Sequence, residues 1–230
     1  MAILEVKNLN IELGGVQVLE NINFEVNRGD VLAIIGPNGA GKTTLLKAIL
    51  GLIDYKGEIK WQQNIKIGYV PQRMDIETDV PLTVKEFFYL RGKQTTDAAI
   101  EDILKAVQLD EKILKSGFGE ISTGQRQRIL IAWAMMENPD ALLFDEPTAD
   151  IDIAGQESIY KMLYNLQKNF NLTIILVSHD LNIVYRYAEK VLCINRQALC
   201  IGTPEEILDT EHLTKLYGGE KGFYHHEHKH

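Results

Sequence analysis

One stretch of this chain, reading VLAIIGPNGAGKTT, constrains its fold more than any other. An apolar run over residues 31–35 stops at Gly36, a glycine-rich segment follows up to Gly41, and a helix-like segment runs from Lys42 to Leu50. Strand, glycine-rich loop and helix is the order that a phosphate-binding loop needs, because convergent backbone N–H groups and the positive end of the helix dipole both attract anions. The sequence therefore predicts an α/β domain that binds a nucleotide.

Two side chains that follow the glycines add specific chemistry to this loop. Lys42 supplies a point charge for the outer phosphates, and the hydroxyl of Thr43 is placed to hold Mg²⁺. The residues that we expect at the phosphates are Gly36, Asn38, Gly39, Gly41, Lys42, Thr43 and Thr44. The loop alone does not identify the reaction, since nucleotide kinases, GTPases, helicases and transporter motors share it.

Length and charge narrow the class of protein. The 230 residues suffice for one large domain with a buried core. With 24 basic and 32 acidic side chains the net charge is -8, which argues against a nucleic-acid partner. The N-terminus does not have the pattern of a signal peptide, and no apolar run reaches the roughly 18 residues of a membrane span. We therefore expect a cytosolic protein.

The pattern of apolar residues changes along the chain. Residues 2–30 alternate apolar and polar in two blocks around Gly14 and Gly15, which predicts an antiparallel sheet. Residues 82–136 have helical periods and predict an inserted helical subdomain. Strands and helices alternate again from Ala141 onward. No internal repeat or linker is visible, so residues 1–230 are predicted to form a single domain.

The two cysteines fall in the segment VLCINRQALCIG, which predicts a hairpin that turns near Arg196 and Gln197. A two-residue turn would place Cys193 opposite Cys200. In the cytosol we expect two reduced thiols that pack in a sheet, with a redox or metal role as the alternative.

A second motif, ALLFDEPT, places two carboxylates at the end of an apolar strand. Ligands of open α/β sheets bind at the carboxyl ends of the strands, so Asp145 and Glu146 are predicted to face the same crevice as the phosphate loop. Asp145 could hold the Mg²⁺ hydration shell beside Thr43, and Glu146 could position and deprotonate an attacking water.

A third motif, ISTGQ, opens a predicted helix. Ser122 and Gln125 have the spacing of a capping box, and such a pair often does no more than cap a helix. The start of a helix is also an anion site, so a second contact with phosphate remains open.

Taken together, GPNGAGKTT, STGQRQR, LLFDEPTADID and VSHD resemble the ATP-binding subunit of ABC transporters in order, spacing and extent. The resemblance implies a P-loop NTPase (RecA-like) core with an antiparallel β-subdomain and an inserted helical subdomain. It also implies an ATPase that binds ATP and Mg²⁺. The segment YVPQRMDIETDVPLTVKEF is similar to the zinc and manganese importer branch, so metal-ion import is the expected function.

The resemblance assigns further roles to individual residues. Gln72 matches the glutamine that senses Mg²⁺ and water, and His179 matches the histidine that contacts the γ-phosphate. Ser122, Gly124 and Gln125 match the signature loop, which contacts the nucleotide of a second subunit, and Asp152 matches the loop that joins the two sites.

The same resemblance implies partners and a location. Two copies would close head to tail around two MgATP as a homodimer, and the motion would drive a separate membrane permease that docks near residues 72–89. A solute-binding protein belongs to the wider complex, and the chain would lie at the inner face of the cell membrane. The alternative is a soluble ABC ATPase in a scaffold role, such as iron-sulfur cluster assembly.

Two positions depart from the family pattern. Thr123 replaces the first glycine of the usual signature, and a β-branched residue resists positive φ and adds bulk near an approaching phosphate. Leu13 stands where the family usually stacks an aromatic ring on adenine, so we expect weak discrimination between bases.

The C-terminal tail contains four of the six histidines: His225, His226, His228 and His230. In a helix, His226 and His230 would share one face, as would His225 and His228, which suits a transition-metal site. A solvated tail and a remnant of cloning are the alternatives.

Overall fold

The computed structural model describes residues 1–72, 81–92, 95–148 and 151–218. Its central sheet has six strands in the order β5-β6-β7-β3-β8-β9, parallel except for the antiparallel pair β8 and β9. Their bounds are β3 Val31–Ile35, β5 Ile67–Val70, β6 Ala141–Asp145, β7 Thr173–Val177, β8 Lys190–Asn195 and β9 Gln197–Gly202. A second sheet has the order β2-β1-β4, with β1 Ala2–Leu13, β2 Val16–Asn27 and β4 Lys56–Trp61.

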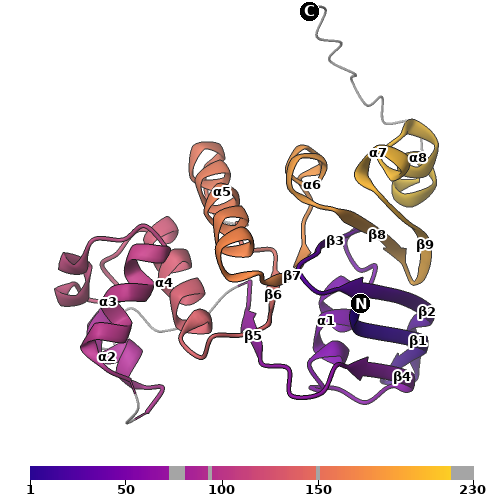
Figure 1. Ribbon diagram of the computed structural model, residues 1–230. Coiled ribbons are helices and arrows are strands. Elements are labelled where there is room, and N and C mark those ends of the chain that lie inside the picture. Colours follow the sequence, from indigo (N-terminus) through magenta and orange to yellow (C-terminus); the bar gives the residue numbers. More distant parts are fainter. Residues whose placement is uncertain (73–80, 93–94, 149–150, 219–230) are drawn as a thin grey trace, which may run out of the picture.

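The helices fall into three groups (Figure 1). The helix α1 Lys42–Ile49 follows the phosphate loop. Four helices lie between β5 and β6 in the sequence: α2 Val84–Tyr89, α3 Asp97–Ala106, the 3-10 helix η1 Glu111–Lys115 and α4 Thr123–Met135. The remaining helices are α5 Ile153–Phe170, α6 Leu181–Tyr187, α7 Pro204–Ile207 and α8 Thr210–Tyr217. No helix among the described residues is long and apolar enough to cross a membrane.

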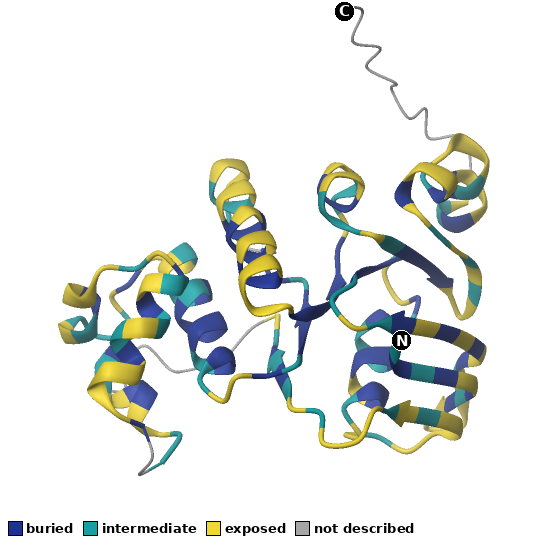
Figure 2. Ribbon diagram, in the orientation of Figure 1, coloured by how far each residue is buried: buried dark blue, intermediate teal, exposed yellow. Residues whose placement is uncertain are grey.

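The three inner strands β3, β6 and β7 of the central sheet are buried on both faces, which explains why they are continuous apolar runs rather than alternating ones. All five residues of β3 are buried (Figure 2). Its odd-numbered residues join the core with α2 to α6. Leu32 and Ile34 join the opposite core with α1 and the small sheet. Strands covered on both faces give the site at their carboxyl ends a rigid base.

The small sheet shows the predicted alternation, because one of its faces packs on α1 and the other faces water. Irregular register interrupts its β1–β2 pair, and Asn8 and Asn21 each have φ 49° at these irregularities. Asparagine tolerates this left-handed conformation better than most residues. The small sheet lies at the opposite end of the molecule from α2, α3 and α4 (Figure 1). The predicted fold class is thereby confirmed.

The prediction of free thiols was wrong, although the predicted hairpin is present. Cys193 and Cys200 are direct partners in the β8–β9 register and form a disulfide, with their Cα atoms 5.0 Å apart. Facing positions in a hairpin meet the Cα spacing that a disulfide requires. The expectation rested on the redox state of the cytosol, which says nothing about this geometry. The helix α8 was not predicted from the sequence.

Candidate functional site

The phosphate loop lies between β3 and α1 and is shaped by close backbone contacts. A Cβ atom on Gly36 would collide with the carbonyl oxygen of Ile194 in β8. On Gly41, with φ 96°, a Cβ would lie 2.6 Å from the side chain of Leu19 in β2. Gly39 has φ 78° and open space around it, so its backbone faces outward unobstructed. The loop is therefore held from two sides, while the Cβ position of Gly39 faces open space.

Lys42, the first residue of α1, is buried at the mouth of this loop. Its ammonium donates hydrogen bonds to the carbonyl oxygens of Gly36 and Pro37, both at 3.0 Å. Burial lowers the pKa of Lys42, while Glu146 and Asp145 act in the opposite direction. The chain thus places a partly desolvated cation where phosphate oxygens would arrive.

Thr43 and Asp145 meet across the crevice, as the sequence predicts. The hydroxyl of Thr43 donates to Oδ1 of Asp145 at 3.1 Å. Asp145 ends β6 and is only 3% exposed, and burial raises the pKa of its carboxyl group. A hydroxyl and a carboxylate are hard oxygen ligands of the kind that Mg²⁺ prefers, so this pair fits the ion. Among the described residues, no group of three or more His, Cys, Asp or Glu side chains forms a metal site.

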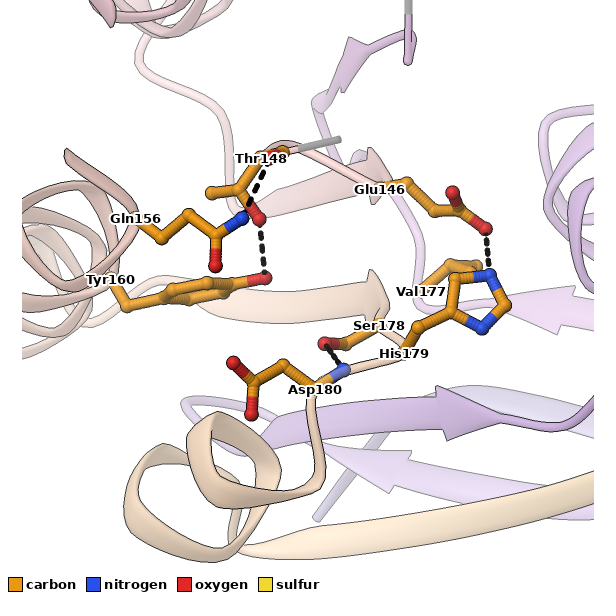
Figure 3. A pocket seen from close by; sticks show the side chains of 8 residues that line it. All are labelled: Glu146, Thr148, Gln156, Tyr160, Val177, Ser178, His179 and Asp180. Atoms are coloured by element: carbon orange, nitrogen blue, oxygen red, sulfur yellow. Dashed lines mark hydrogen bonds and ion pairs between the residues drawn. The ribbon is translucent and has the colours of Figure 1, made fainter. Parts of the chain in front are cut away.

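The carboxylate of Glu146 is held at both oxygens by residues that lie far away in the sequence. Gln72 donates its amide to Oε2 at 3.0 Å, and His179 contacts Oε1 (Figure 3). Glu146 has φ 49°, an unfavourable conformation for a residue with a side chain. Backbone strain of this kind concentrates at functional sites. The three residues to which we assign catalytic roles therefore lie together.

The signature residues form a second pocket of about 470 Å³ at the starts of α4 and α5. Ser122 and Gln125 exchange the two hydrogen bonds of a capping box, at 3.2 and 3.0 Å, as predicted. Asp152 lines the same pocket and caps α5. This pocket shares no lining residue with the one beside Glu146 and His179. The signature loop and the pair of Glu146 and His179 therefore line separate pockets.

The expected conflict at Thr123 is absent from the structure. Thr123 is the first residue of α4 and is not among the residues with positive φ, so its branched side chain causes no backbone strain. A Cβ on Gly124 would meet nothing within 4 Å, which leaves the entrance of the helix open. The concern about bulk near a phosphate remains a prediction, but the one about backbone conformation was wrong.

Leu13 ends β1 with 44% of its surface exposed, and it pairs with the exposed Val16 across the turn. Farther along β2, Val18 and Leu19 contact the Cβ position of Gly41. The side of the phosphate loop that faces β2 is therefore apolar, and the role of Leu13 at the base stays a prediction. The four tail histidines lie outside the described residues.

Sequence reasoning assigned no role to six residues that line the pocket beside Glu146 and His179: Thr148, Gln156, Tyr160, Val177, Ser178 and Asp180. The spacing of Gln156 and Tyr160, four residues apart in a predicted helix, indicates a shared face. That signal could have identified the pair but not its partners.

The fold and the site together define a P-loop nucleotide-binding ATPase. Residues 19–149 match the family model described as ABC transporter. The chain belongs to the ABC transporter family, and within it this protein is an ATP-binding subunit that hydrolyses ATP.

Relatives extend over almost the whole chain. The zinc import ATP-binding protein ZnuC of Ehrlichia chaffeensis is 38% identical, over 94% of this chain and 89% of that protein. The protein of the same name from Pasteurella multocida is 36% identical, over 100% of this chain and 89% of its own length.

Solved structures agree. A metal-chelate type ABC transporter in an inward-facing conformation has a TM-score of 0.85 at 31% identity, covering 94% of this chain and 89% of that one. The cbiO1 protein of Clostridium perfringens, part of the ABC transporter complex cbiONQ, has a TM-score of 0.80 at 28% identity, covering 93% of both chains.

Proposed function

We propose that this protein hydrolyses ATP to power a separate membrane permease that imports a metal ion of the zinc or manganese type. The observation that carries hydrolysis is the Glu146 carboxylate, held by Gln72 and His179 beside the phosphate loop. The observation that supports the cargo is the name of the relatives, which are zinc import ATP-binding proteins. The alternative of a scaffold in iron-sulfur cluster assembly is not favoured by them.

Each residue of the site has a role in this proposal. Lys42 and the loop amides bind the β- and γ-phosphates, and Glu146 accepts a proton from the attacking water. His179 fixes the carboxylate and contacts the γ-phosphate, while Gln72 fixes its other oxygen. Thr43 and Asp145 would hold Mg²⁺, which would supply neutralisation of the charge on the phosphates.

The second pocket supplies the other half of a composite site. Ser122, Gly124 and Gln125 lie at the open start of α4, where the helix dipole and free N–H groups favour an anion. In the proposed homodimer they contact the γ-phosphate bound by the partner copy, and Asp152 joins the two sites.

The permease is proposed to dock on the helical subdomain near residues 72–89. Of this range, residues 73–80 lie outside the described part of the chain. At its end Tyr89 is 40% exposed, and the adjacent Leu90 is 68% exposed. The Tyr89 hydroxyl donates to Asp97 at 2.8 Å, and Lys85 forms an ion pair with Asp97 at 2.9 Å, which fixes the aromatic ring at the surface. An exposed apolar pair on a fixed support suits a protein contact at the inner membrane face.

Co-purification from detergent extracts of the source cells tests transport against the scaffold role. The full chain carrying Glu146→Gln serves as bait with MgATP, and the variant Lys42→Ala serves as the nucleotide-free control. Recovery of a multispanning membrane protein, followed by ATP-dependent uptake of Zn²⁺ or Mn²⁺ in proteoliposomes, is expected. Recovery of soluble cluster-assembly factors alone would contradict transport. A solute-binding protein that stimulates uptake would complete the proposed complex.

For the tail we propose weak binding of a transition metal by His225, His226, His228 and His230. Support comes from their spacing and from imidazole being a common zinc ligand. Calorimetry with Zn²⁺ on the full chain and on a chain that ends at residue 218 tests this. Heat that is present in the first and lost in the second is expected, and equal heats would rule the tail out.

A further inference from the structure

A polar network lies behind the pair of Glu146 and His179. It surrounds a cavity of about 270 Å³ (Figure 3). The lining residues come from the end of β6, from α5 and from the end of β7: Glu146, Thr148, Gln156, Tyr160, Val177, Ser178, His179 and Asp180. The cavity therefore separates the two segments that carry the proposed catalytic groups, and α5 forms its third wall.

Tyr160 of α5 contacts the segment that bears Glu146 and lines the cavity beside the segment that bears His179. It is only 2% exposed, and its hydroxyl lies 3.3 Å from that of Thr148, two residues after Glu146. Burial raises the pKa of the Tyr160 phenol, while the hydrogen bond with Thr148 acts in the opposite direction. Ser178, which directly precedes His179, lines the same cavity as Tyr160. A phenol that stays neutral at physiological pH acts here by hydrogen bonding rather than by proton transfer.

The ring of Tyr160 is itself fixed. It stacks on Tyr187 of α6, with ring centroids 6.2 Å apart and planes at 17°. One turn earlier on α5, the amide of Gln156 donates to the carbonyl oxygens of Thr148 at 3.2 Å and Ile151 at 2.9 Å. Both side chains thus hold the segment after Glu146 from the same face of α5.

We propose that Tyr160, assisted by Gln156, is a positioning residue that sets the segment bearing Glu146 relative to the segment bearing His179. This inference rests on the proposed roles of Glu146 and His179 in hydrolysis. Turnover depends steeply on such placement, since an error of about 1 Å can lower it about 100-fold. Binding of ATP depends on the phosphate loop, which the network does not touch.

The variant Tyr160→Phe keeps the ring and removes only the hydroxyl. We expect kcat to fall about tenfold, as for loss of one well-placed hydrogen bond, while KM and the Kd for ATP stay within about twofold. The matched control is Tyr164→Phe, one turn further along α5, whose half-exposed ring contacts the same Tyr187 at 6.1 Å. This control should leave kcat unchanged.

A double-mutant cycle tests the connection itself. Thr148→Val removes the partner hydroxyl at nearly constant volume, and the double variant with Tyr160→Phe should be no slower than the slower single variant. Additive losses would overturn the proposed link between Thr148 and Tyr160.

Two other results would overturn the inference. One is a turnover of Tyr160→Phe within about twofold of that of the original protein. The other is a loss of kcat accompanied by weaker ATP binding and a lower melting temperature, because these together indicate general damage to the fold. If Tyr160→Phe has normal turnover while Glu146→Gln abolishes hydrolysis, the role of Tyr160 is rejected and the proposed role of Glu146 stands. Normal turnover of Glu146→Gln would instead reject the proposed catalytic roles.

Discussion

The phosphate loop and the signature loop both use the start of a helix to meet phosphate, yet they are built in opposite ways. The first is wedged between strands of both sheets, and its lysine and neighbouring carboxylate are desolvated. The second lies at an open helix start whose exposed side chains are satisfied by their own capping box. The buried loop can bind nucleotide within one chain, whereas the exposed loop is suited to contact another molecule.

The largest expected effect tests whether the site beside the phosphate loop contains the catalytic base. Glu146→Gln keeps the size of the side chain and its contact with Gln72 but cannot accept a proton. ATP hydrolysis should fall at least about 100-fold, with the affinity for ATP retained and a dimer trapped by MgATP. Phosphate release and light scattering measure the two outcomes. Near-normal turnover would remove Glu146 as the base.

The next effect tests whether the exposed signature loop acts only between two copies of the chain. Gly124→Asp places a carboxylate where a Cβ has open space, and an acid in the first turn suits the helix dipole. Folding stability should therefore hold, while repulsion of the partner's γ-phosphate lowers turnover about 100-fold. Gly124→Ala is the uncharged control and should lose much less. If Gly124→Asp weakened ATP binding to the monomer, the two halves would not be separate.

A smaller effect concerns Leu13, the residue that we expect to cover the base of the nucleotide. Leu13→Tyr should tighten ATP binding about 3- to 10-fold, because an aromatic contact is worth about 0.5–1.5 kcal/mol beyond the area it covers. Leu13→Met adds no ring and is the control. Titrations with ATP and GTP measure the ratio of the two affinities. A ratio of about tenfold or more in the unmodified protein that Leu13→Tyr leaves unchanged would contradict weak base discrimination.

The smallest effect concerns the stability of the protein without nucleotide. The pKa of Asp145 is raised from its ordinary value of 3.8 by burial, so the folded state holds this proton more readily than the unfolded state. The stabilisation from that proton is complete below about pH 3.8, the pKa in the unfolded state, and is lost as pH rises through the pKa of the folded state. Asp145→Asn should therefore melt about 2–4 °C higher at neutral pH, as expected for about 1 kcal/mol in a chain of this size.

The matched measurement for Asp145→Asn is the melting-temperature difference between variant and original across pH 4 to 8 without nucleotide. The difference should grow with pH and then level off. A difference that stays constant with pH would show that the carboxyl charge is not its cause, and a lower melting temperature for the variant would contradict the predicted sign.

Local signals explain what could be predicted from sequence. The strand at Val31–Ile35, the helix from Lys42 and the capping box at Ser122 each depend on residues that are close together in the chain. The fold class and the meeting of Thr43 with Asp145 followed from the rule that ligands bind at the carboxyl ends of parallel strands.

Other side-chain contacts between residues that lie far apart in the sequence could not be predicted from the residues alone. Gln72 and Glu146 are 74 residues apart, and only family resemblance brought them together beforehand. The contact between Thr148 and Tyr160 depends on the orientation of α5 relative to the end of β6. The pattern of apolar residues does not predict that orientation. For the disulfide, the predicted hairpin gave the facing positions of Cys193 and Cys200, but nothing in the sequence gave their oxidation state.

The contacts that wedge the phosphate loop also bear on the speed and selectivity of binding. The loop meets Ile194 and Leu19 from separate hairpins, and Arg196 donates its N–H to the carbonyl oxygen of Ala40 at 3.3 Å. A loop fixed this way loses its conformational entropy during folding instead of on encounter with the nucleotide. Such preorganisation favours rapid capture without a slow rearrangement. In the proposed homodimer, closure between the two copies would then be the step that the proposed permease regulates.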